Sequence, residues 1–238
     1  MVLSVVIPAY NEGRSIATTI RETFDFFTSY PELVMEVLVV NDGSTDDTGA
    51  VVRGLVAQYD GLRLLCNEGN RGKGFSVRRG ALESRGEYIL FMDADLSTPL
   101  SQFEKIWPVA KKYDIVIGSR ALESSRIIVR QSFAKRYAGK LGNYIIRTLL
   151  GLPFRDTQCG FKIFSGKARE VFKRQTIQRW GFDFELLFIA RRHYLQCVEI
   201  AVEWRNDPTS AVRGRDYWRT LAEVFTVLVN DFNGRYVK

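Results

Sequence analysis

The chain has 238 residues, enough for one large domain with a sizeable buried core. Apolar residues make up 46% and charged residues 26%, which excludes a disordered chain. The formal net charge is +7, and most of the excess lies between Arg120 and Arg147, where seven basic residues face only Glu123. A local positive field of this kind suits an anionic lipid head group, a phosphorylated substrate or nucleic acid.

The cysteines and the hydropathy pattern limit the compartment. Cys66, Cys159 and Cys197 are odd in number and form no Cys-x-x-Cys pair, so neither a disulfide framework nor a zinc site is expected, and a reducing compartment is favoured. The start, MVLSVVIPAY, lacks the basic region of a signal peptide. Because no segment approaches the roughly 18 apolar residues of a spanning helix, any membrane contact is expected to be peripheral.

Short apolar, β-branched runs alternate with longer amphipathic stretches over the first half. Strands are expected at 2–8, 35–41, 62–66, 87–92 and 114–119, and helices at 13–28, from about 46, at 73–84 and at 101–111. Strands that are apolar on both faces and are each followed by a helix indicate a parallel sheet covered on both sides. Ligands of such sheets bind at the carboxyl ends of the strands, so the residues directly after each strand are the candidates for function.

After Ser119 the pattern changes to long amphipathic stretches. A helix is expected at 132–149, followed by the turn GLPFRDTQCGF, a strand KIFS, a helix FDFELLFIARR, a strand CVEIAVEW and a tail helix at 216–232. The helix at 132–149 has an apolar stripe beside basic residues, which suits core contact and a lipid interface equally. This stripe contains Phe133, Tyr137, Leu141, Tyr144, Ile145 and Thr148, flanked by Arg136, Lys140 and Arg147. For the tail helix, core contact is favoured for the stripe of Trp218, Leu221, Phe225, Leu228, Val229 and Phe232.

Asp93 and Asp95 directly follow the apolar strand YILFM. On an extended chain, residues i and i+2 point to the same face, so the two carboxylates are expected to converge. Oxygen ligands of this kind suit Mg²⁺ or Mn²⁺, which complete their shells with water and phosphate oxygens. The alternative for an isolated Asp-x-Asp is an acidic junction between a strand and a turn.

Further polar loops are expected at the same edge of the sheet: PAYNE at 8–12, NDGSTDDT at 41–48 and NEGNRGKG at 67–74. Tyr10 suits stacking on a nucleobase, and Asp42 suits accepting a hydrogen bond from a base N–H. Helix capping explains Ser44, Thr45 and Asp46 but not Asp42 at the strand end. The glycines of the third loop allow close backbone approach, and Lys73 is placed to meet a phosphate, although a flexible loop before a helix would have the same composition.

In this order, LSVVIPAYNE, VVNDGSTDDT, NRGKG and FMDADLST resemble the family 2 glycosyltransferases. RTLLGLPFRDTQCGFKIF, WGFDFELLFIARR and EIAVEWRNDPTS resemble the polyprenyl-phosphate branch: dolichyl-phosphate mannosyltransferases and, more closely, β-glucosyltransferases. The resemblance implies an α/β GT-A fold, a Rossmann-like, mainly parallel sheet flanked by helices, with C-terminal amphipathic helices. It divides the chain into a nucleotide-sugar-binding half (1–119), an acceptor-binding half of the same domain (120–212) and a C-terminal amphipathic helix (213–238).

The resemblance also implies roles for individual residues. The nucleotide-binding set comprises Pro8, Tyr10, Asn11, Glu12, Asp42, Ser44, Asn70, Lys73, Asp93, Ala94 and Asp95. Asp93 and Asp95 would hold Mg²⁺ or Mn²⁺, and they join Arg120 and Asp156 in the catalytic set. The acceptor-binding set comprises Arg126, Arg130, Lys135, Arg136, Lys162 and Arg205. Mannosyl relatives carry Gln as a metal contact where this chain has Ser97, which leaves the third metal ligand open.

The implied reaction is inverting transfer of a hexose, glucose from UDP-glucose, to polyprenyl or dolichyl phosphate by a peripheral protein on the cytoplasmic face of a membrane. A phosphate nucleophile is already an anion and requires no strong general base, and the sole histidine, His193, is expected at the surface. Two alternatives stay open: a GDP-mannose donor, and a non-catalytic membrane-surface or nucleic-acid-binding module that uses residues 120–147. No nucleic-acid motif is present, so no nucleic-acid partner is expected. The fingerprints of dinucleotide oxidoreductases and P-loop NTPases are also missing from the first strand–helix turn and from GNRGKGFS.

Overall fold

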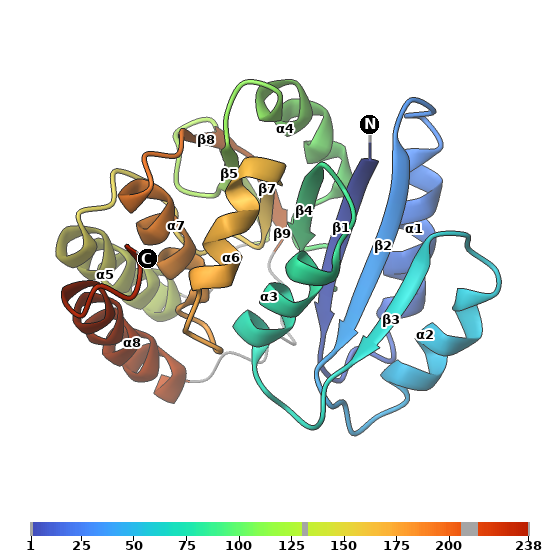
Figure 1. The fold of residues 1–238 in the computed structure, drawn as a ribbon, viewed down its shortest axis with the longest axis horizontal. Helices are drawn as coiled ribbons and strands as arrows, with labels where there is room; N and C mark the ends of the chain where they lie inside the picture. The colour runs from blue at the N-terminus through green and yellow to red at the C-terminus, as the bar shows by residue number, and fades with distance from the viewer. Residues whose placement is uncertain (1, 130–132, 206–213, 238) are drawn as a thin grey trace.

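A seven-stranded sheet forms the centre of the molecule (Figure 1). A computed structural model describes residues 2–129, 133–205 and 214–237, with only the backbone described at 129, 133–138 and 214–218. In the order in which they lie side by side, the strands are β3 (Leu62–Cys66), β2 (Val34–Asn41), β1 (Val2–Ala9), β4 (Tyr88–Met92), β7 (Phe161–Ser165), β5 (Ile115–Ser119) and β8 (Cys197–Ala201). All neighbours are parallel except β7, which runs antiparallel between β4 and β5.

Helices cover both faces of the sheet because successive side chains of its buried strands point to opposite sides. In β1, Val5 and Ile7 pack in one hydrophobic cluster, whereas Val6 packs in the other. The first cluster takes side chains from α1 (Ile16–Phe27), α2 (Thr48–Val56) and α4 (Phe103–Ala110). The second takes them from α3 (Lys73–Glu83), α5 (Phe133–Leu150), α6 (Glu170–Arg174), α7 (Phe182–Arg192) and α8 (Gly214–Phe232).

A second, two-stranded parallel sheet joins β6 (Arg126–Val129) to β9 (Glu203–Arg205). The strand expected over CVEIAVEW is therefore two strands, β8 and β9, which belong to different sheets. The expectations from sequence also lacked β6, α6 and the short 3₁₀ helices η1 (Leu100–Gln102) and η2 (Gly166–Arg169). β6 was not predicted because it is only four residues long and its first three residues are exposed.

α5 and α8 pack against each other at the end of the molecule opposite β3 (Figure 1). Ile146 and Leu150 of α5 and Val224 and Val227 of α8 are buried. Several large apolar side chains of the same helices are exposed: Leu141, Tyr144, Leu149, Phe225, Val229 and Phe232. The core contact expected for the tail stripe is therefore wrong at Phe225, Val229 and Phe232, and the side chain of Trp218 lies outside the described residues. Within the part of the chain that the structure describes, no helix combines the length and apolarity needed to span a membrane.

Candidate functional site

The loops after β1 and β2 are tied together at the carboxyl edge of the sheet. The backbone N–H of Asn11 donates to Ser44 Oγ (3.0 Å), and Asn11 Oδ1 accepts from the backbone N–H of Thr45 (2.8 Å). The backbone N–H of Glu12 donates to Thr48 Oγ1 (2.8 Å). Asn11 and Ser44 therefore hold the two loops in register, while Tyr10 is 43% exposed beside them and remains free to stack on a planar ligand.

Asp42 anchors the glycine-rich loop 67–74 to the end of β2. Its buried carboxylate accepts from the backbone N–H groups of Arg71 (3.0 Å) and Gly72 (2.8 Å) and from Asn67 Nδ2 (2.7 Å). The contact with a nucleobase expected for Asp42 must share the carboxylate with this loop. Asn70, from the same loop, is exposed.

Lys73 lies against the first aspartate of the Asp-x-Asp turn. Its Nζ is 2.6 Å from Asp93 Oδ1, the distance of an ion pair, but this buried oxygen receives no hydrogen bond of good geometry. Burial alone would lower the pKa of Lys73, but the carboxylates of Asp93 and Asp183 outweigh it and raise that pKa, so the ammonium is charged. The loop therefore supplies a fixed cation at the end of β4.

The two aspartates are brought together by a turn. β4 ends at Met92, and Ala94 and Asp95 form a turn, so the alternation of an extended strand, used in the prediction, does not orient them. Asp95 Oδ1 accepts from the backbone N–H of Ser97 (2.9 Å). The pKa of Asp95 is raised, first by burial and then by the negative charge of Asp93.

This pair fits a divalent cation that takes most of its ligands from elsewhere. Asp93 Oδ1 is buried without a hydrogen bond, and a Cβ at Gly160 would lie 1.9 Å from Asp93 Oδ2, so the glycine gives the carboxylate its space. Within the described ranges, no group of three or more His, Cys, Asp or Glu side chains is arranged to hold a metal ion. Two carboxylate ligands completed by phosphate and water oxygens suit Mg²⁺ or Mn²⁺ better than a site made of protein ligands alone.

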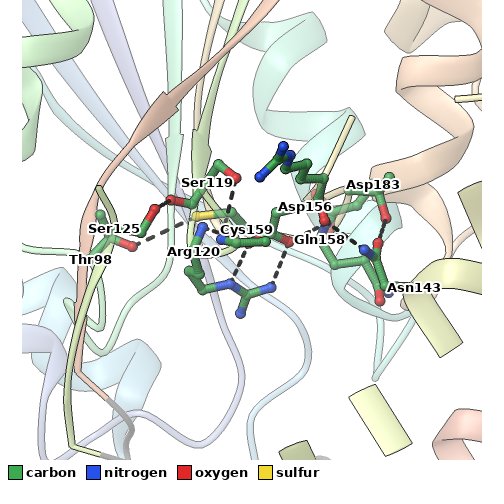
Figure 2. A network of polar contacts seen from close by, with 12 residues as sticks. Thr98, Ser119, Arg120, Ser125, Asn143, Asp156, Gln158, Cys159 and Asp183 are labelled. Carbon is green, nitrogen blue, oxygen red and sulfur yellow. Dashed lines mark hydrogen bonds and ion pairs between the residues drawn. The ribbon is translucent and has the colours of Figure 1, made fainter. Parts of the chain in front are cut away.

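Arg120 and Asp156 form a bidentate pair beyond the end of β5 (Figure 2). Arg120 Nε and Nη2 donate to the two carboxylate oxygens at 2.7 and 2.9 Å, and the backbone N–H of Arg120 donates at 3.0 Å. The backbone N–H groups of Arg155 and Asp156 donate in turn to Glu199 on β8 (2.7 and 2.8 Å). Burial alone would raise the pKa of Asp156, but Arg120 outweighs it and holds that pKa below its usual value, so both groups are charged.

Lys162 and Asp183 form a completely buried pair that sequence analysis recognised only in part. Lys162 Nζ donates to Asp183 Oδ1 and to the carbonyl oxygen of Cys159 (2.6 Å). Lys162 therefore faces Asp183 instead of solvent, and its expected contact with an acceptor stays a prediction. Asp183 was not among the expected site residues, although two acidic residues, Asp183 and Glu185, among the apolar side chains at the start of α7 are a signal that could have identified it.

The profile of Glycosyl transferase family 2 matches residues 4–174. The chain belongs to the family 2 glycosyltransferases. It is 39% identical over 213 residues to a dolichyl-phosphate beta-glucosyltransferase of Trichomonas vaginalis, and 35% identical over 218 residues to that of Homo sapiens. These alignments cover 84% and 85% of this chain, and 63% and 67% of the relatives. The chain thus spans about two thirds of the length of these relatives.

Solved structures confirm the GT-A fold expected for this glycosyltransferase. Mannosyl-3-phosphoglycerate synthase from Rubrobacter xylanophilus aligns with a TM-score of 0.70 at 19% identity, over 99% of this chain and 75% of its own. Glucosyl-3-phosphoglycerate synthase from Mycobacterium tuberculosis, in complex with Mn²⁺, UDP-glucose and phosphoglyceric acid, aligns with a TM-score of 0.64 at 21% identity, over 95% and 79% of the two chains. At these identities the likeness shows the fold alone.

Part of the acceptor-binding set expected from the sequence lies on the small sheet. Arg126 on β6 is exposed, and its Nη1 is 4.0 Å from Glu203 of β9. Arg205 ends β9, and its backbone N–H donates to the carbonyl oxygen of Ser97 (2.8 Å), which brings that strand next to the Asp-x-Asp turn. Arg130 lies outside the described residues, as do the side chains of Lys135 and Arg136 on α5. Of the remaining nucleotide set, Pro8 and Ala94 are buried.

Proposed function

We propose that this glycosyltransferase transfers glucose, with inversion, from UDP-glucose to a polyprenyl phosphate such as dolichyl phosphate. The observation that carries the reaction is the Asp93 carboxylate, which has one oxygen ion-paired with Lys73, the other in the space left by Gly160, and Asp95 in the same turn. The names of the relatives support a glucosyl donor and a dolichyl-phosphate acceptor. The neighbour crystallised with Mn²⁺ and UDP-glucose supports a uridine donor and a divalent ion.

In this proposal the chain mainly neutralises and positions phosphate charge. Asp93 and Asp95 would hold Mg²⁺ or Mn²⁺, which when bound offsets the charge of the departing diphosphate. Lys73 places a second positive charge at the same point. Arg120 gives two of its five N–H bonds to Asp156, and the three that remain suit the oxygens of a phosphate group. An anionic acceptor phosphate attacks without a general base.

The proposed acceptor requires contact with a membrane surface, which α5 and α8 would provide. Their exposed apolar side chains, among them Tyr144 and Phe232, suit burial in the outer layer of a bilayer. The basic residues from Arg120 to Arg147 suit anionic head groups. We propose the cytoplasmic face because the three cysteines are free in the structure.

Thermal unfolding in the presence of nucleotides tests the donor. With Mn²⁺, UDP and UDP-glucose are expected to raise the melting temperature, since a ligand at a hundredfold its Kd adds about 2.7 kcal/mol to native stability. GDP and GDP-mannose are the matched controls. Stabilisation by the guanine compounds alone would identify GDP-mannose, instead of UDP-glucose, as the donor. No response to any of the four, together with salt-dependent binding to arbitrary DNA, would favour the non-catalytic module.

A further inference from the structure

Residues 175–181, between α6 and α7, form a segment that packs against the glycine-rich loop 67–74; we call it the bridge segment. The backbone N–H of Phe75 donates to the carbonyl oxygen of Gln178 (2.9 Å), and Gln175 Nε2 donates to that of Gly74 (2.8 Å). A Cβ at Gly72 would lie 2.5 Å from the carbonyl oxygen of Gln178, and a Cβ at Gly74 would lie 2.7 Å from the carbonyl oxygen of Ile177. Loop and bridge segment thus touch backbone to backbone.

The bridge segment also contacts Lys73 directly. The ammonium group of Lys73 lies 5.4 Å from the centre of the Trp180 ring, in cation–π geometry. The same ammonium group forms the ion pair with Asp93. Any displacement of the bridge segment therefore moves the cation at the proposed metal site and the backbone N–H groups that anchor Asp42.

Glu185 holds the start of the bridge segment from α7. Its fully buried carboxylate accepts from the backbone N–H groups of Thr176 (3.0 Å) and Ile177 (2.8 Å) and from Thr176 Oγ1 (2.5 Å). Burial raises the pKa of Glu185, and the hydrogen bonds from Thr176, Tyr236 and Ile177 oppose this rise by stabilising the charged form. Removing one of them leaves a buried charged group undersatisfied, which is more costly than losing an exposed hydrogen bond.

The last hydrogen bond to Glu185 comes from the C-terminal end of the described chain. Tyr236 is fully buried, and its hydroxyl donates to Glu185 Oε1 (2.7 Å). From α8, Asn230 Nδ2 donates to Thr176 Oγ1 (2.9 Å), and Glu223 Oε2 accepts from the backbone N–H of Gly181 (2.7 Å). Both ends of the bridge segment are therefore fixed by α8 and the residues that follow it.

We infer that Glu185 and Tyr236 are positioning residues for the nucleotide-sugar donor. Glu185 and Tyr236 hold the bridge segment in place, and the bridge segment holds the loop 67–74. The loop in turn positions Lys73 beside Asp93 and positions the backbone N–H groups of Arg71 and Gly72 on the Asp42 carboxylate. The inference rests on the proposed function, because it takes the donor site to be the site around Asp42, Lys73 and Asp93. It makes α8 and Tyr236 contributors to donor binding through the loop, without contact between either and the donor.

Tyr236→Phe tests the inference, because it removes one hydroxyl and keeps the ring. The KM for UDP-glucose and the Kd for UDP with Mn²⁺ are expected to rise about fivefold, the effect of one net hydrogen bond, while kcat at saturating donor stays within about twofold. Phe27→Leu, in the core at the far end of α1, is the control for lost stability. Unchanged donor affinity in Tyr236→Phe, or an equal loss in Phe27→Leu, would overturn the inference.

Hydrogen exchange provides a readout that a purely structural role would not change. UDP with Mn²⁺ is expected to slow exchange of the amides of Thr176, Ile177 and residues 230–237 in the wild type, since coupling between two sites is reciprocal. The same slowing is expected to be lost in Tyr236→Phe. If the wild type binds UDP without this protection, the positioning role fails alone. If the wild type binds no nucleotide, the proposed function fails.

Discussion

At Asp93, three constraints meet on one carboxylate. Lys73 lies 2.6 Å from one oxygen, Gly160 leaves space for the other, and the charge of Asp95 lies close by in the same turn. A carboxylate that served only the fold would be expected to have its buried oxygens hydrogen-bonded, as nearly all buried polar groups are. Asp93 Oδ1 has an ion pair with Lys73 but no hydrogen bond of good geometry, so this carboxylate is the strongest residue-scale indication of a ligand.

Asp93→Asn and Asp95→Asn are expected to remove transfer activity and leave the fold intact. Each variant keeps the shape of the side chain but loses a charged ligand, which should cost at least about 3 kcal/mol of transition-state stabilisation, or more than a hundredfold in rate. Asp60→Asn, an exposed site outside the loops after β1, β2 and β4, is the matched control. Near wild-type turnover in both variants, with no effect of a chelator, would exclude a metal held by these residues.

Asp156 gives the protein a pH dependence of stability with a defined sign. Its pKa is lower in the folded protein than the ordinary value of 3.8, because Arg120 outweighs the opposing effect of burial. The unfolded chain therefore binds the proton first as pH falls, and the stability contributed by the pair is present above the unfolded pKa and lost below it. The difference in melting temperature between the wild type and Asp156→Asn is expected to shrink from about pH 6 to about pH 3. A difference independent of pH would mean that the pair contributes through shape alone.

The residues of the site were predictable where a motif places them directly after a strand, as at Asp42, Asp93 and Arg120. What they bind in the structure was less predictable, because it depends on segments distant in sequence. Lys162 was expected at an acceptor, yet it is buried on Asp183, twenty-one positions away. Asp42 was expected to meet a base and instead holds a loop near residue 72.

At the scale of the helices, α8 shows how periodicity alone misplaces a face. Apolar residues lie on more than one side of α8. The stripe through Phe225 and Phe232 was predicted to be the core face, but the buried apolar residues among those described are Val224 and Val227. The predicted and observed buried faces differ by a rotation about the helix axis. Apolar residues on two sides of a helix do not determine which side is buried. The alternation of strands and helices in the first half was predicted closely because β1, β2, β4 and β5 are buried on both faces.

The exposed side of α8 leads to a prediction about membranes. Phe225→Ser with Phe232→Ser is expected to weaken cosedimentation with anionic liposomes, because both rings are exposed in the free protein and would be buried in the lipid interface. The melting temperature should change little, since neither ring is in the core. Val34→Ser, an equally exposed apolar site on β2, is the control. Liposome binding that the double substitution leaves unchanged would assign the membrane contact to another surface.

At the scale of the whole molecule, β7 connects the two halves of the chain, residues 1–119 and 120–212, within one sheet. β7 comes from residues 161–165 but lies between β4 and β5, both of which come from the first 119 residues. β4 and β5 are not hydrogen-bonded to each other in the seven-stranded order. The expected division at residue 119 therefore falls within one sheet and one pair of shared hydrophobic clusters.

A fragment of residues 1–119 is consequently expected to remain unfolded or to aggregate. Without β7, one edge of β4 has unpaired backbone groups, and β5 has no partner strand. Circular dichroism and size-exclusion chromatography of the fragment, with the full chain as control, measure this directly. A monomeric fragment with a cooperative thermal transition would show that the first half folds by itself.

The late arrival of β7 also has a consequence for synthesis on the ribosome. β4 ends at Met92, whereas β7 is complete only at Ser165, so about 70 further residues must be made before the gap in the sheet closes. At roughly 5–20 residues per second, the apolar edge of β4 stays open for several seconds on every nascent chain. Unpaired edges of this kind are where chains associate wrongly. The growing polypeptide is thus a natural client for chaperones that bind apolar segments during translation.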